Sequence, residues 1–244
     1  MIEIENLVKT YDAFRAVDGL SFTVAPGEIV GLVGPNGAGK TTTLRCLSGI
    51  IPPTSGRISI DGYDLAGDPV EAKRRLSFVP DEPHLFDHLT AWDYLTVIAR
   101  IYGVADGEER AEMLLAQFGL ADRKHAFPAE LSRGMKQKLM ISAALLHRPR
   151  ALVLDEPLTG LDPRAMRQMK DTIVSASRDR AAVIVSSHML RLVEEICTRV
   201  VIIHRGKIVL DGTLEEIRRG VPELGAAADL EDVFLRATEE APPA

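Results

Sequence analysis

The stretch that most constrains this chain runs from Gly34 to Thr41 and has the pattern G-x-x-x-x-G-K-T. A short apolar run at 28–33 precedes it as a predicted buried strand, and a predicted helix at 42–48 follows. Glycines let successive N–H groups point into one concavity, and the helix adds the positive end of its dipole. Lys40 can reach the β- and γ-phosphates of a nucleotide, and the Thr41 hydroxyl can ligate Mg²⁺. The alternative is a glycine-rich turn with an incidental lysine, but the flanking strand and helix favour a nucleoside triphosphate site.

The composition is typical of a globular protein with a sizeable core. The 244 residues fit one domain with subdomains, 46% of them hydrophobic and 26% charged. No run is long enough to span a bilayer and no signal peptide opens the sequence, so another polypeptide would have to supply any membrane spans. A net charge of −6 argues weakly against general nucleic-acid binding and leaves room only for a local basic patch, so no nucleic-acid partner is expected. Cys46 and Cys197 lack partners at metal-ligand spacing, which predicts buried thiols in the cytoplasm.

Short apolar runs alternate with helix signals and predict an α/β fold with a mainly parallel sheet. Extended runs before the phosphate loop, together with an Asp-Gly turn at 61–62, predict an antiparallel β subdomain at the N-terminus. From about 82 to 150 the pattern becomes helical, with a variant capping box formed by Thr90 and Asp93. We therefore expect a helical subdomain inserted into the sheet core.

The strand–helix pattern resumes after residue 150. A strand at 151–154 leads into Asp155-Glu156, and Asp162 is a predicted N-cap with proline at the first helical position. We expect one domain over 1–220 and a short C-terminal extension over 221–244, partly helical and frayed at its end.

Three polar side chains follow predicted core strands at the edge where α/β sheets bind ligands. Asp155 would hold Mg²⁺ directly or through water, and Glu156 could polarise an attacking water. His188 follows the next strand and could donate to the γ-phosphate or to that water. The alternative is two solvated acids at a strand end and a histidine that begins a helix.

The segment from Leu131 to Gln137 predicts a second helix end that can bind an anion. Ser132 is a predicted N-cap, a glycine lies nearby, and two lysines occupy the first turns of the helix. The phosphate loop already supplies one phosphate-binding site in this chain. The N-terminus of this second helix therefore indicates a nucleotide held elsewhere, for example by another copy of the chain. An ordinary capped helix is the alternative.

These motifs, in this order and spacing, resemble the nucleotide-binding subunit of ABC transporters over residues 1 to about 220. The family's signature sequence matches 131–135, its Asp-Glu strand end matches 155–156, and its next loop matches 160–162. Its switch histidine matches His188, and its base-stacking aromatic matches Tyr11, which in isolation reads as a strand-end aromatic. The resemblance implies a P-loop NTPase core.

The resemblance also implies a set of site residues. Glu156, His188 and Lys40 would be catalytic, and Mg²⁺ would be held by Thr41, Asp155 and Asp81. The residues that would bind ATP are Tyr11, Gly34, Pro35, Asn36, Gly37, Ala38, Gly39, Lys40, Thr41, Thr42, Ser132, Gly134 and Asp162. In the family, Ser132 and Gly134 contact ATP held by the partner subunit of a head-to-tail dimer.

The chain departs from the family pattern in the signature segment and at Asp81. Arg133 replaces the first glycine of the signature and Met135 its glutamine, a form that resembles a bacterial exporter branch handling drugs, peptides, lipids or polysaccharides. Asp81 stands where the family usually has a glutamine that touches Mg²⁺, so an amide donor and one methylene of reach are lost. Our hypothesis is that Asp81 still contacts Mg²⁺ or its water, with altered coupling. The stretch 82–94 would border the groove for the membrane subunit.

The resemblance implies an ATPase that drives solute export through a separate integral membrane permease. Its other partner would be a second copy of itself or a homologous ATPase subunit, on the inner face of the plasma membrane. The alternatives are a soluble ABC ATPase in a role such as cofactor assembly, and an importer ATPase. A kinase is disfavoured, because Ser132, Gly134 and His188 would then lack a purpose.

Overall fold

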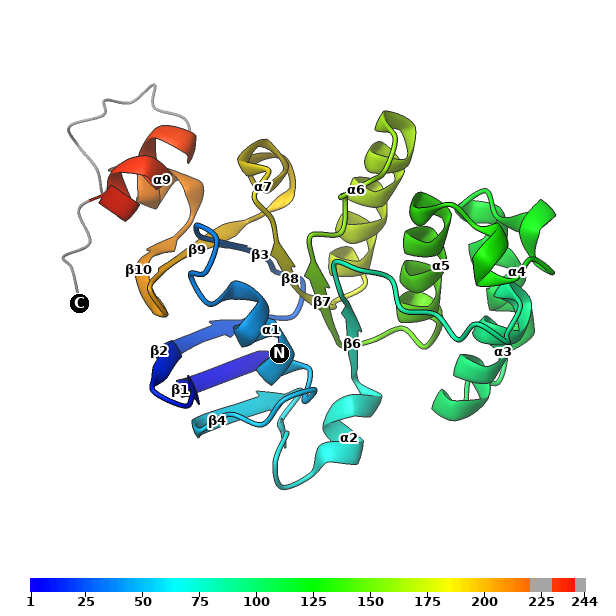
Figure 1. Cartoon of the computed structure of the whole chain (residues 1–244), viewed down its shortest axis with the longest axis horizontal. Coiled ribbons are helices and arrows are strands. Elements are labelled where there is room, and N and C mark those ends of the chain that lie inside the picture. The colour runs from blue at the N-terminus through cyan, green and yellow to red at the C-terminus, as the bar shows by residue number, and fades with distance from the viewer. Residues whose placement is uncertain (220–229, 240–244) are drawn as a thin grey trace.

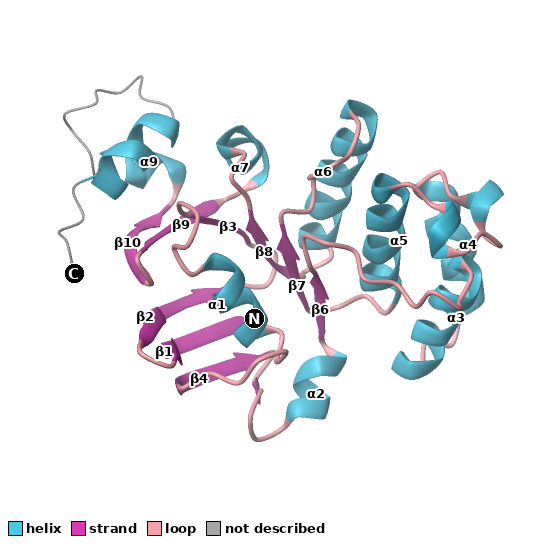
Figure 2. Ribbon diagram, in the orientation of Figure 1, coloured by secondary structure: helices cyan, strands magenta, loops and turns pink. Residues whose placement is uncertain are grey.

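The computed structural model describes residues 1–219 and 230–239, which form two sheets flanked by helices (Figure 1; Figure 2). The first sheet is antiparallel and has the order β2 (Phe14–Val24), β1 (Ile2–Tyr11), β4 (Ser55–Ile60), β5 (Tyr63–Asp64). The second has the order β10 (Lys207–Gly212), β9 (Arg199–His204), β3 (Ile29–Val33), β8 (Ala182–Ser186), β7 (Ala151–Asp155), β6 (Leu76–Val79). All its pairs are parallel except β9 with β10. The predicted α/β fold, with its antiparallel N-terminal part, is confirmed.

The turn between β4 and β5 follows the Asp-Gly prediction. Asp61 and Gly62 have φ angles of 51° and 86°, the positive values that a type I′ hairpin turn requires at both central positions. Asparagine, aspartate and glycine are the residues that adopt such values at least cost.

The second sheet is covered by helices, and its central strands are buried throughout. β3, β7 and β8 contain only buried residues, as expected for parallel strands packed on both faces. The neighbouring helices are α1 (Lys40–Leu47), α2 (Pro69–Arg74), α6 (Pro163–Arg178) and α7 (Leu190–Ile196). Parallel register brings the carboxyl ends of the strands to one edge, where Asp155 pairs with Ser186. This edge carries the candidate site.

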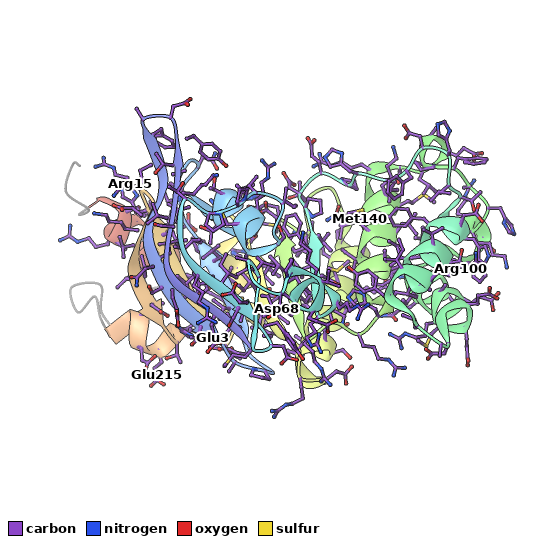
Figure 3. The ribbon with its side chains drawn as sticks, turned by 90° about the horizontal axis from the view of Figure 1, so that it is seen from below. Glu3, Arg15, Asp68, Arg100, Met140 and Glu215 are labelled. Carbon is purple, nitrogen blue, oxygen red and sulfur yellow. The ribbon has the colours of Figure 1, made fainter. Side chains whose placement is uncertain are left out.

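The chain between β6 and β7 forms the predicted helical group, which Figure 1 shows on the far side of the second sheet from β1, β2 and β4. Figure 3 places Arg100 and Met140 in this group and Glu3 and Arg15 at the opposite end of the molecule. The helices are α3 (Ala91–Tyr102), α4 (Gly107–Gln117) and α5 (Arg133–Leu146), with 3₁₀ turns at Ala121–Arg123 and Pro128–Glu130.

The start of α3 confirms the predicted capping box. The Asp93 N–H donates to Thr90 Oγ1 over 3.1 Å, and the Thr90 N–H donates back to Asp93 Oδ2 over 3.3 Å. The helical spacing of Trp92, Leu95, Ile98 and Tyr102 predicts one core-facing stripe on α3, but Trp92 and Ile98 are only half-buried, whereas Tyr94 is buried. The reason is that both α4 and α5 pack against α3, so the buried face is wider than one stripe.

The C-terminal region continues through α8 (Leu214–Arg219) and α9 (Leu230–Glu239). α9 contacts α7, α8 and β10 and buries Leu230 and Val233, so it is packed onto the second sheet's edge. The boundary expected near 220 and the frayed end at 240–244 lie outside the described residues. Within the described ranges, no helix combines the length and apolar character needed to cross a membrane.

Both cysteines are buried, as the sequence predicted. Cys46 lies in α1, and Cys197 follows α7. Burial raises the pKa of the Cys46 thiol to about 11 and that of Cys197 to about 12. Both are therefore neutral core groups at physiological pH.

Candidate functional site

The loop between β3 and α1 is shaped by glycines that no other residue could replace. Gly39 has a φ of 107°, and a Cβ there would lie 2.5 Å from the carbonyl oxygen of Ala16. A Cβ on Gly34 would lie 2.3 Å from the carbonyl oxygen of Ile203. Gly39 is also the N-cap of α1 and offers no side-chain acceptor to the first-turn N–H groups. These donors are therefore free to bind an anion.

Lys40 begins α1, and its ammonium group folds back over the loop. Nζ donates to the carbonyl oxygens of Gly34 and Pro35 over 2.6 and 3.1 Å. The pKa of Lys40 lies below its usual value, mainly because the ammonium group is partly buried. The nearby negative charges of Glu156 and Asp155 offset part of this effect. The lysine is thus a cation partly removed from water and held at the phosphate loop.

Asp155 ends β7 at the carboxyl edge of the second sheet. Its side chain is 3% exposed, and Oδ1 accepts a hydrogen bond from the hydroxyl of Ser186 at the end of β8. Ser186 occupies only one of the lone-pair positions of the two carboxylate oxygens, so Asp155 can also bind a cation.

Glu156 follows β7 in a left-handed conformation, with a φ of 48°. This turn aims its carboxylate at His188, which follows β8. The backbone N–H of His188 donates to Glu156 Oε1 over 3.0 Å, and the ring nitrogen Nδ1 of His188 lies 2.8 Å from Glu156 Oε2. The Glu156 side chain is 17% exposed and that of His188 is 66% exposed. Because the carboxylate accepts, Nδ1 carries the shared proton, and the imidazole fixes the orientation of Glu156.

Asp81 lies two residues after β6 and faces the same region. Its Oδ1 is buried and has no hydrogen bond donor from the described residues. The nearest cation is Arg133, whose Nη2 lies 3.7 Å from this oxygen.

These groups line one cavity of about 630 Å³, which combines residues from six parts of the chain. Its lining is Tyr11, Phe14, Ala16, Asn36, Gly37, Ala38, Gly39, Lys40, Thr41, Thr42, Asp81, Asp155, Glu156, Thr159 and His188. Gly34 and Pro35 do not line it but hold Lys40 through their carbonyl groups. The structure therefore brings together the expected phosphate loop, the acids, His188 and Tyr11.

Three of the cavity residues were not expected from the sequence. Phe14 pairs with Tyr11 across the β1–β2 hairpin and is 63% exposed. Ala16 and Thr159 line the wall next to the loop and the acids. The signal that could have identified Phe14 is its position opposite Tyr11 in the β1–β2 hairpin. The register of this hairpin has several shifts, so the pairing could not be derived from the sequence.

Ser132, Gly134 and Asp162 do not line this cavity. Ser132 is the N-cap of α5, and its hydroxyl accepts from the Met135 N–H over 3.3 Å. Asp162 is the N-cap of α6, and its carboxylate accepts from the Ala165 N–H over 2.9 Å. Hydrogen bonds from the α6 backbone hold the pKa of Asp162 below its usual value. Both predicted caps are confirmed as caps.

The donor set near the phosphate loop fits Mg²⁺. No group of three or more His, Cys, Asp or Glu side chains that could hold a metal occurs in the described part of the chain. Mg²⁺ commonly binds through one or two carboxylates together with substrate phosphates and water. Asp155, which is buried, and Asp81, whose Oδ1 accepts no hydrogen bond from the described residues, line the cavity with Thr41 and offer oxygen ligands of this kind.

The decisive comparison is with a model of the ABC transporter family, which matches residues 17–159. The chain belongs to this family. It is 36% identical over 242 residues to the ABC-type transporter ATP-binding protein EcsA of Bacillus subtilis (strain 168), covering 98% of this chain and 97% of EcsA. It is 40% identical over 213 residues to Nod factor export ATP-binding protein I of Burkholderia thailandensis, covering 86% and 70%.

Solved structures agree with this assignment. The ATP-binding subunit of an ABC transporter superposes with a TM-score of 0.92 at 36% identity, over 97% of this chain and 99% of the other. The ATP-binding cassette MJ0796, in a dimeric post-hydrolysis state bound to ADP and Pi, shares the fold with a TM-score of 0.81 at 23% identity, over 88% and 99%. The protein is therefore an ATP-binding subunit of the ABC transporter family.

Proposed function

We propose that this ABC subunit hydrolyses ATP and drives solute export through a separate integral membrane permease. The observation that carries hydrolysis is the hydrogen-bonded pair of Glu156 and His188 on the wall of the phosphate-loop cavity. A carboxylate that is held in one orientation and reaches the cavity can accept a proton from an attacking water.

Each part of the cavity has a task in this proposal. Lys40 exchanges its bonds to the Gly34 and Pro35 carbonyl groups for the β- and γ-phosphate oxygens. Tyr11 stacks on the base, and the free N–H groups at the start of α1 bind the phosphates. Thr41, Asp155 and Asp81 would hold Mg²⁺, which supplies charge stabilisation to the phosphates when bound. Glu156 orients and deprotonates water, and His188 keeps Glu156 in place.

The residues outside the cavity support a head-to-tail dimer. Ser132 is the N-cap of α5, Gly134 lies in its first turn, and Asp162 is the N-cap of α6. None of the three lines the nucleotide cavity of its own chain. A second copy would place its Ser132 and Gly134 against the γ-phosphate, so that each site combines two chains. The dimeric state of the similarly folded MJ0796 is consistent with this arrangement.

Export is supported by the relatives and by the signature segment. With Arg133 and Met135, the signature resembles that of the exporter branch, and one relative is named a Nod factor export ATP-binding protein. The permease would dock beside residues 82–94 and hold the subunit at the cytoplasmic face of the membrane.

The test is Glu156→Gln, which keeps the side-chain length but removes the base. We expect ATP hydrolysis to fall by about 10²-fold or more, and ATP with Mg²⁺ to accumulate a stable dimer in gel filtration. Glu109→Gln on the exposed side of α4 is the matched control and should behave as wild type. A Glu156→Gln protein that stays monomeric at saturating ATP would contradict the dimer mechanism.

A further inference from the structure

Asp81 and Arg133 both depart from the family pattern, and in the fold their side chains form an ion pair. Asp81 follows β6 and lines the nucleotide cavity, while Arg133 is the first residue of α5. Arg133 Nη2 lies 3.7 Å from Asp81 Oδ1. The side chains are 53% and 46% exposed, respectively, so the pair lies at the surface where the cavity borders the helical group.

The contact satisfies the Asp81 carboxylate only in part. A separation of 3.7 Å is an ion pair but is too long for a hydrogen bond. Oδ1 is itself buried, and no described residue donates a hydrogen bond to it. Because Asp81 Oδ1 is buried and accepts no hydrogen bond from the described residues, it would bind a cation that came closer than Arg133.

The stem of Arg133 also lies along the loop that follows Glu156. A Cβ on Gly160 would lie 3.5 Å from both Cδ and Nε of Arg133. The carbonyl oxygen of Gly160 would lie 3.2 Å from a Cβ on Gly134. The start of α5 therefore rests on the loop between Glu156 and Asp162, and Arg133 contacts this loop and the Asp81 carboxylate together.

We propose that Arg133 is a positioning residue for Asp81, holding its carboxylate toward α5 until Mg²⁺ and nucleotide compete for it. In the nucleotide-free protein, Arg133 is the cation that faces Asp81 Oδ1. When Mg²⁺ and nucleotide are bound, Asp81 turns to the metal side, and Arg133 is freed at the start of α5. Metal binding in the cavity is thereby linked to the helix that carries the signature segment. The inference rests on the proposed nucleotide site.

The test is a double-mutant cycle read by binding rather than by turnover. The full chain is titrated with Mg²⁺ in the presence of a fluorescent, non-hydrolysable ATP analogue. Arg133→Ala is expected to lower the half-saturating Mg²⁺ concentration by about two- to fivefold, the range that an exposed ion pair can supply. Asp81→Asn should raise it, and Arg133→Ala should have no further effect in the Asp81→Asn background.

Two controls separate positioning from a structural role. Arg133→Lys keeps the charge and should restore the wild-type Mg²⁺ dependence. Arg100→Ala removes an exposed arginine of α3 that Figure 3 shows in the helical group, and it should change nothing. Binding of the analogue without Mg²⁺ should be the same in all Arg133 variants.

The possible failures are distinguishable. The positioning role is wrong if Arg133→Ala leaves the half-saturating Mg²⁺ concentration unchanged. It is also wrong if Arg133→Ala shifts that concentration by the same factor in the wild-type and Asp81→Asn backgrounds. In both cases the nucleotide site stands. If the analogue does not bind to wild-type protein, or binds equally well to Lys40→Ala, the proposed nucleotide site fails and the inference falls with it.

Discussion

Asp155 and Glu156 are adjacent carboxylates that the backbone directs to different partners. Asp155 belongs to β7, and its side chain accepts from Ser186 on the neighbouring strand. Glu156 adopts a left-handed conformation, and its side chain accepts from His188 instead. Separate partners reduce the repulsion between the two charges. In the proposed mechanism, Asp155 would hold the metal and Glu156 would act on water.

The ring of His188 gives a prediction about turnover. His188→Ala removes the Nδ1 contact, which frees the Glu156 carboxylate to rotate away from the attacking water. We expect kcat for ATP hydrolysis to fall by about 10²-fold or more with little change in KM, because the ring holds Glu156 and not the phosphate loop. Phosphate release at a series of ATP concentrations measures both constants. His125→Ala, at an exposed position before the second 3₁₀ turn, is the control, and a change confined to KM would contradict the assigned role.

A second histidine, His147, gives a prediction about stability in acid. His147 follows α5, stacks on Tyr102 with ring centroids 3.7 Å apart, and lies 3.3 Å from the hydroxyl of Ser77. Burial is the main cause that lowers its pKa from the ordinary value of 6.5 to about 4. Between these pH values the unfolded chain takes up a proton that the folded chain does not, so the folded state loses stability as the pH falls.

His147→Phe tests this effect, since it keeps an aromatic ring on Tyr102 and removes the titration. Between pH 7 and 4.5 the wild type should lose about 2 to 3 kcal/mol more unfolding free energy than the variant. Urea unfolding at the two pH values measures the difference. Equal losses in both proteins would show that His147 is not the acid-sensitive group.

At the scale of elements, features with a local cause were predictable and features set by packing were not. The caps at Thr90, Ser132 and Asp162 follow from a side chain three residues from its backbone donor. The approach of Asp81 to Arg133 depends on how α5 rests against the loop after β6, which no local pattern encodes. For the same reason the phosphate loop and the strand-end acids could be placed from the sequence, whereas Phe14 could not.

The segment before α3 and its first turn give a prediction about the membrane partner. Phe86 is 62% exposed, and its ring centroid lies 5.9 Å from that of Tyr94. If the permease docks here, Phe86→Asp places a charge in an apolar contact and should reduce co-purification with the permease by about tenfold. Nucleotide binding should be unchanged. Phe127→Asp, at another exposed aromatic, is the matched control, and equal recovery of both variants with the permease would contradict the docking site.

At the scale of the whole molecule, the signature segment and the phosphate loop are carried by separate parts of the fold. The loop lies between β3 and α1 at the sheet edge, whereas Ser132 and Gly134 belong to the helical group. Neither of these two residues lines the cavity of its own chain. A nucleotide site that uses both parts therefore needs two chains.

Mixing two inactive variants tests whether the site is shared. Lys40→Ala removes the lysine of the phosphate loop. Ser132→Asp keeps an N-cap acceptor for α5 and, in the proposed dimer, would place a negative charge against the partner's phosphate. In a head-to-tail dimer, one chain of each variant assembles one site with two defects and one intact site. Because half of the randomly formed dimers are mixed, hydrolysis should recover to about a quarter of wild type if the sites act independently. Phosphate release after mixing measures this recovery. Were Ser132 to act in its own chain, neither site of the mixed dimer would be intact, and mixing would restore nothing.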